Sequence, residues 1–161
     1  MSRKVIPFIV FCAVYLVVAV GLIFVLVGFF KHPQHGAITT YLTGGSLLLL
    51  SLTIAKVLKR TIHKKRPPKK KELFMPFDTY AFPSGHATGL SSITLFIFLY
   101  SIPLGICSLI ISLVIVIARV ESYVHDTVDI IGGIIVGSLV TYTSYPIVLN
   151  FVDVYISPLF L

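Results

Sequence analysis

The sequence predicts an all-α fold, a polytopic transmembrane helical bundle of about five spans with its functional site at one membrane face. Hydrophobic residues make up 57% of the chain and charged residues only 12%, whereas soluble domains carry about 25% charged residues. Mean hydropathy is +1.00. The charges are also clustered, because eight of the 13 Lys and Arg residues lie in residues 59–71. Between the charged segments lie uncharged runs of about the 20 residues that a membrane crossing needs.

These apolar runs position the expected helices. We expect one integral membrane domain, residues 1–161, with spans near residues 5–30, 38–58, 84–100, 104–120 and 128–151. The first run follows Arg3 and Lys4, as the apolar part of a signal peptide would. It contains 26 uncharged residues and no convincing small-residue cleavage site, so we interpret it as a retained transmembrane helix.

The third apolar run, residues 87–118, is too long for one upright span and short for two. Pro103 and Gly105 lie near its middle and favour a tight turn there. Splitting the run gives five spans. The basic segment 59–82, the start of the third helix and the segment 119–129 then share one membrane face, whereas four spans would separate the last from the other two.

Three polar groups on this face carry the chemistry. Lys59 is followed after six residues by Arg66 and a proline, residues 83–86 read PSGH, and Arg119 is followed by His125 and Asp129. A specified tetrapeptide should occur by chance in such a chain about once in a thousand cases. Together the three groups resemble the signature of the type-2 phosphatidic acid phosphatase superfamily, which joins membrane lipid phosphate phosphatases with vanadium-dependent haloperoxidases.

The residue types also suit phosphate chemistry in their own right. A phosphate monoester carries up to two negative charges and needs fixed cations, which Lys59, Arg66 and Arg119 can supply. Ser84 is suited to be the N-cap of the third helix, and Gly85 permits close backbone approach to the free N–H groups of a helix start. These five residues are the candidate phosphate-binding set.

His125, His86 and Asp129 are the candidate catalytic residues. His125 and Asp129 are four residues apart, so on the first turn of the fifth helix the carboxylate could orient the imidazole and stabilise its charged form. The resemblance implies that His125 attacks phosphorus to give a phosphohistidine, and that His86 protonates the leaving lipid oxygen and then activates water. It calls for no metal and no other cofactor, because the cations do the work of a metal.

Ala118 departs from the family pattern, which usually has serine at this position. The missing hydroxyl leaves open a non-catalytic lipid-phosphate-binding protein. A lipid-to-lipid phosphotransferase would use the same residues, whereas the peroxidases are large soluble proteins. We interpret residues 64–71 apart from Arg66 as a polybasic patch on anionic lipid, and give Asp126 no role.

The expected partners are a lipid phosphate substrate and membrane lipids, with no nucleic acid. Because no soluble segment is large enough to recognise an elaborate head group, we expect polyprenyl phosphates or diphosphates first. Glycerophospholipid phosphates such as phosphatidylglycerophosphate or phosphatidate come next, and lipid A last. The expected location is the cell membrane, and the positive-inside rule places the site on the cytoplasmic face, although substrate-attracting charge could imitate that signal.

Overall fold

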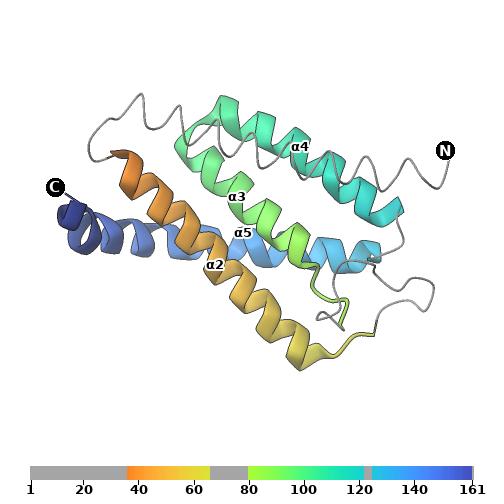
Figure 1. Cartoon of the computed structure of the whole chain (residues 1–161). Coiled ribbons are helices and arrows are strands. Elements are labelled where there is room, and N and C mark those ends of the chain that lie inside the picture. The colour runs from red at the N-terminus through yellow and green to blue at the C-terminus, as the bar shows by residue number, and fades with distance from the viewer. Residues whose placement is uncertain (1–35, 66–79, 122–124, 161) are drawn as a thin grey trace.

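The computed structural model describes residues 36–65, 80–121 and 125–160, and this part of the chain is helical (Figure 1). The expected first span, residues 5–30, lies outside it. The elements are α2 (Gly36–Ile62), α3 (Gly85–Tyr100), α4 (Ile102–Glu121) and α5 (Thr127–Phe151), followed by a π-helical turn (Val152–Ile156) and a 3-10 turn (Ser157–Phe160). Ser101 alone separates α3 from α4, so the third apolar run is broken where the sequence predicted a break.

Helix α3 lies at the centre of the bundle and contacts α2, α4 and α5. Glycines on α5 permit its close approach to α3. A Cβ atom at Gly133 would lie 2.6 Å from the carbonyl oxygen of Ser84, and one at Gly137 would clash with Thr88 and Ser91. Helix α4 also packs along α3 but makes few contacts with α5. Helices α4 and α5 therefore both pack on α3 without packing closely against each other.

The interior of the bundle is rich in hydroxyl groups. Ser51 of α2, Ser92 of α3 and Thr141 of α5 are buried and form a chain of hydrogen bonds of 3.1 and 2.7 Å. Leu47, Phe96 and Ile97 form a small apolar cluster in the core, but many other large apolar residues lie on the outside, and Leu49 and Ile147 are 67% and 71% exposed. So much exposed apolar surface would be unfavourable in water, and its placement indicates a membrane protein.

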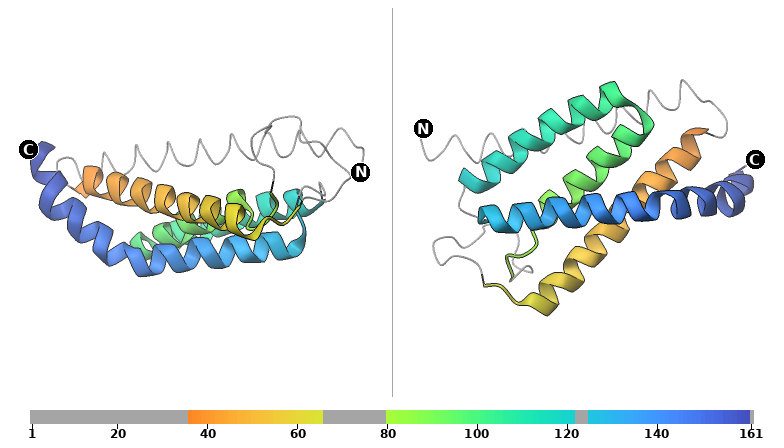
Figure 2. Two further views of the ribbon diagram at one scale, coloured as in Figure 1. Left: turned by 90° about the horizontal axis from the view of Figure 1, so that it is seen from below. Right: turned by 180° about the vertical axis from the view of Figure 1, so that it is seen from behind.

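Two helical stretches of the described chain, Thr39–Ile62 and Thr127–Leu159, are long and apolar enough to cross a membrane, while α3 and α4 are shorter apolar helices. The count of five spans stays a prediction. Helix α5 bends before the C-terminal turns (Figure 2), and Pro146 lies inside it, which accounts for a bend because proline removes one helical hydrogen bond. At the opposite end of the bundle, α2 and α4 end where α3 and α5 begin (Figures 1 and 2).

Candidate active site

The start of α3 forms one wall of the candidate site. Ser84 has the extended backbone of an N-cap, with φ −68° and ψ 116°, and its buried Oγ accepts a hydrogen bond from the N–H of Ala87 at 3.5 Å. The capping role expected of Ser84 is thus confirmed. Gly85 is the first helical residue, and a Cβ atom there would meet no atom of the described residues within 4 Å. The start of this helix is therefore open on the side of Gly85, with its N-terminal dipole available to an anion.

The start of α5 forms the opposite wall. Asp126 is the N-cap, and its backbone N–H donates to Oδ2 of Asp129 at 3.1 Å. His125 was expected on the first helical turn but lies one residue before the cap. The two side chains still meet, because Asp129 points back across the cap, and Nδ1 of His125 lies 3.7 Å from Oδ2. Both side chains are buried, at 2% and 0% exposure.

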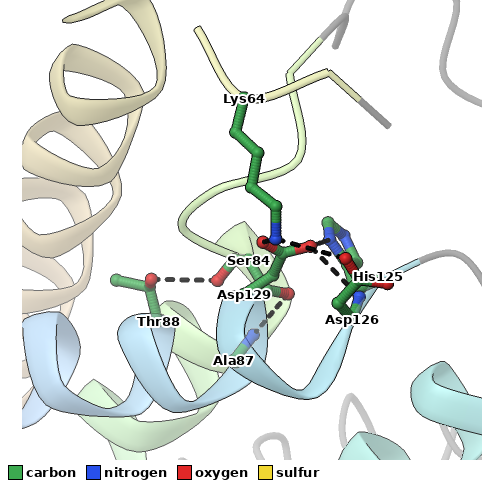
Figure 3. A network of polar contacts seen from close by, with 7 residues as sticks. All are labelled: Lys64, Ser84, Ala87, Thr88, His125, Asp126 and Asp129. Carbon is green, nitrogen blue, oxygen red and sulfur yellow. Dashed lines mark hydrogen bonds and ion pairs between the residues drawn. The ribbon is translucent and has the colours of Figure 1, made fainter. Parts of the chain in front are cut away.

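Asp129 contacts the other wall of the site at Ser84 and also binds Lys64, which follows the end of α2 (Figure 3). Its backbone carbonyl accepts a hydrogen bond from the N–H of Ser84 at 2.9 Å. Its Oδ1 accepts one from Nζ of Lys64 at 2.6 Å, and the same ammonium group lies 3.2 Å from Oδ2 of Asp126. A fully buried carboxylate requires such partners, because an unpaired buried charge is strongly unfavourable.

The surroundings of Lys64 shift its pKa upward from the ordinary 10.5. Partial burial by itself lowers this pKa, but the hydrogen bonds and charges of Asp129 and Asp126 raise it by more in sum. Lys64 therefore stays protonated throughout the physiological range and holds a positive charge beside the buried carboxylate.

The segment that carries Lys64 is fixed by backbone pairing. Its carbonyl accepts a hydrogen bond from the N–H of Ala81 at 2.8 Å, and Lys65 forms an antiparallel bridge with Tyr80. The ring of Tyr80 also meets that of His63 edge-on, with centroids 4.7 Å apart. The chain is thus pinned on both sides of residues 66–79.

The other expected site residues fall on the same end of the bundle where the structure describes them. Lys59 lies in the last turn of α2 and is 7% exposed, and His86 is the second residue of α3 and is partly exposed. Arg66 lies outside the described residues. Arg119 belongs to α4, and its side chain is outside the description, as is that of Ala118.

Sequence reasoning missed Lys64, which we had assigned to a polybasic patch, and Asp126, to which we had given no role although it caps α5 and binds Lys64. Nothing in the basic run singles out Lys64 from its neighbours. The available signal was Asp129 itself, because a carboxylate beside a histidine in an apolar chain needs a second, cationic partner.

An apolar cavity of about 220 Å³ opens beside the site, between α3, α4 and α5. On α3 its lining begins at Ala87, which is capped by Ser84, and reaches Phe98. Leu109 and Val116 line it on α4, and Ile134 on α5. The eleven steps from Ala87 to Phe98, at a rise of 1.5 Å each, correspond to about 16 Å along the axis of α3. The cavity thus leads from the start of α3 far into the apolar part of the bundle.

Comparison with known proteins gives two matches. A family model for the PAP2 superfamily matches residues 38–153. Among solved structures, the fold is similar to that of a transmembrane PAP2-type phosphatidylglycerolphosphate phosphatase from Bacillus subtilis, with a TM-score of 0.62 and 23% sequence identity. The similarity covers 92% of this chain and 75% of that one. The matched family segment contains the site residues from Lys59 to Asp129.

Proposed function

Because the chain belongs to the PAP2 superfamily, we propose that it is an integral membrane enzyme that hydrolyses a phosphate or diphosphate from a lipid. The observation that carries this proposal is the buried pair of His125 and Asp129 at 3.7 Å, tied through Asp129 to the open start of α3. A histidine with one nitrogen turned to a carboxylate, beside a helix N-terminus that suits an anion, is arranged for nucleophilic attack on phosphorus.

We propose different roles for the two ring nitrogens of His125. Nδ1 faces Asp129, which leaves Nε2 as the nucleophile. Nε2 forms a bond to phosphorus while the bond from phosphorus to the lipid oxygen breaks, and His86 gives its proton to that oxygen. His86 then takes a proton from water, whose oxygen attacks the phosphohistidine and releases phosphate. Asp129 stabilises the positive charge that the ring carries in between.

We propose that the phosphoryl group binds at the N-terminus of α3, the positive end of its dipole, and to three cations. Gly85 leaves room for phosphate oxygens at the first turn of the helix, and the cap at Ser84 fixes the direction of its N–H groups. Lys59, Arg66 and Arg119 would neutralise the charge that develops in the transition state.

The cavity between α3, α4 and α5 is a candidate binding site for the lipid chain. Gly132, Gly133 and Gly137 lie along α5. In the structure Phe82 and α3 fill the space at these glycines, so they serve close packing. The apolar cavity beside α4 suits a polyprenyl or acyl chain, and the cation-rich end suits a phosphate or diphosphate. Polyprenyl phosphates and glycerophospholipid phosphates remain the proposed substrate classes; the structurally similar Bacillus subtilis protein is named for one of the latter.

The test compares a long-chain lipid phosphate with its water-soluble head-group analogue at equal concentration in mixed micelles, using purified wild-type protein and His125→Ala. We expect faster release of phosphate from the lipid and none from the variant. Equal or faster hydrolysis of the soluble analogue would refute a chain-binding site. Appearance of the phosphate on an added lipid alcohol would identify a phosphotransferase, and binding without turnover would identify a non-catalytic protein.

A further inference from the structure

The two carboxylate oxygens of Asp129 have different partners. Oδ1 accepts the short hydrogen bond from Lys64, at 2.6 Å. Oδ2 accepts from the backbone N–H of Asp126 at 3.1 Å and is the oxygen that faces Nδ1 of His125. The carboxylate is therefore held at both ends, and the end that meets the histidine is the one without the lysine.

A carboxylate attached at Cβ is not held by its own torsion, because χ2 of aspartate is broad and roughly two-fold. One hydrogen bond from Asp126 would leave the group free to tilt about that contact. The second hydrogen bond, from Lys64 to the opposite oxygen, fixes the plane of the group. Lys64 can do this because its own backbone is fixed: its carbonyl accepts a hydrogen bond from the N–H of Ala81. Asp126 also provides its ammonium group with a second acceptor, at 3.2 Å.

We propose that Lys64 is a positioning residue for the catalytic histidine: it holds Oδ1 of Asp129 so that Oδ2 stays directed at Nδ1 of His125. The catalytic consequence rests on the proposed function. In this role Lys64 acts through Asp129 and not on the substrate, so its removal should slow the chemical step and leave substrate binding nearly unchanged.

Kinetics of matched variants test this role. Lys64→Met keeps the length of the side chain but removes its charge, and we expect kcat to fall roughly ten- to hundredfold, as for a misaligned catalytic group, with KM changed less than about twofold. Lys64→Arg restores a donor and should recover most of the activity. The control is Lys65→Met, because Lys65 is exposed and pairs with Tyr80 only through its backbone.

A double-mutant cycle separates positioning from a general structural effect. In an Asp129→Asn background, Lys64→Met should cause no further loss of kcat, because the group it positions has already lost its charge. Additive losses, or an equal loss in Lys65→Met, would overturn the proposal. If Lys64→Met does not fold, Lys64→Gln takes its place in the cycle.

A measurement without substrate distinguishes failure of this inference from failure of the proposed function. In protein labelled with 15N-histidine in detergent micelles, the signals of His125 are identified by their loss in His125→Gln. We expect Lys64→Met to shift these signals and Lys65→Met to leave them unchanged. Unshifted signals would overturn the role of Lys64 whatever the protein hydrolyses. Shifted signals in a protein that hydrolyses no lipid phosphate would retain the contact and overturn the function.

Discussion

The backbone N–H of Ser84 donates a hydrogen bond to the backbone carbonyl of Asp129 at 2.9 Å, which links the cap of α3 to the first turn of α5. Ser84, which caps α3, and Asp129, which faces His125, therefore share one backbone contact. Gly133, one turn further along α5, lies against the carbonyl of the same serine. The start of α3 and the start of α5 should consequently move as one body.

Replacement of Gly133 by alanine should disturb this contact. The added Cβ atom would lie 2.6 Å from the carbonyl oxygen of Ser84 and 2.8 Å from Cβ of Ala87, so α3 and α5 must separate. We expect a loss of about 1–3 kcal/mol in unfolding free energy, measured by thermal or denaturant unfolding in detergent. Gly45→Ala is the control, because a Cβ atom there meets nothing within 4 Å and alanine favours a helix by about 0.5–1 kcal/mol. Equal stability of both variants would contradict the close approach.

The phosphohistidine mechanism makes a prediction about inhibitors and intermediates. Activity should persist in the presence of chelators and be blocked by vanadate, which can adopt the five-coordinate geometry of the transition state. His125→Ala should lose both turnover and phosphoenzyme labelling. His86→Ala should still form phosphoenzyme from a substrate with a good leaving group, because the nucleophile remains and less proton donation is needed. Inhibition by a chelator that magnesium reverses would count against this scheme.

The alanine at position 118 offers a gain-of-binding experiment. If phosphate approaches this position next to Arg119, then Ala118→Ser adds one hydrogen bond and should tighten vanadate binding by about 1 kcal/mol, or roughly fivefold. Inhibition constants for vanadate in wild type and variant measure the effect. Identical constants would mean that the substrate does not come within reach of this side chain.

The ion pair of Lys64 should give the protein a specific sensitivity to alkali. Because the folded-state pKa of Lys64 is raised above 10.5, its contribution to stability is complete below that pH and is lost as the pH rises through the folded-state value. The difference in melting temperature between wild type and Lys64→Met should therefore be constant from neutral pH to about pH 10 and shrink above it. Lys65→Met controls for the titration of other groups, and a difference that persists unchanged at higher pH would argue against the pair.

Orientation in the membrane can be tested with single cysteines. In a chain lacking Cys12 and Cys107, we expect Lys69→Cys to be protected and His35→Cys to be labelled by an impermeant reagent on intact cells, because the basic face should be cytoplasmic. Labelling of position 69 alone would place the active site on the outer face. The basic residues would then serve to attract substrate.

The features that the sequence predicted well are those with a local cause. The cap at Ser84 follows from a proline, a serine and a glycine ahead of an apolar run, and the break at Ser101 follows from Pro103 and Gly105. The contact of His125 with Asp129 was expected from their spacing on a helix. It occurs across the helix cap instead, because Asp126 occupies the cap position and leaves His125 outside the helix.

Features that depend on tertiary packing could not be read from the sequence. One lysine of a basic run turns inward because backbone pairing at Ala81 sets its position, and that pairing joins segments far apart in the chain. The central position of α3 in the bundle could not be predicted from the sequence for a related reason. Its buried face carries hydroxyl residues such as Ser92 and Thr94, whereas patterns derived from soluble proteins place polar residues outside.

The antiparallel bridge between Lys65 and Tyr80 joins two positions that are 15 residues apart in the chain. The two ends of the segment between these residues are held together by the bridge and by the hydrogen bond from the N–H of Ala81 to the carbonyl of Lys64. Since the entropy of closing a loop grows only slowly with its length, residues 68–79 could be lengthened, shortened or replaced while Lys64 and the buried carboxylate keep their places. A change of length between residues 68 and 79 should therefore leave the contact between Lys64 and Asp129 in place.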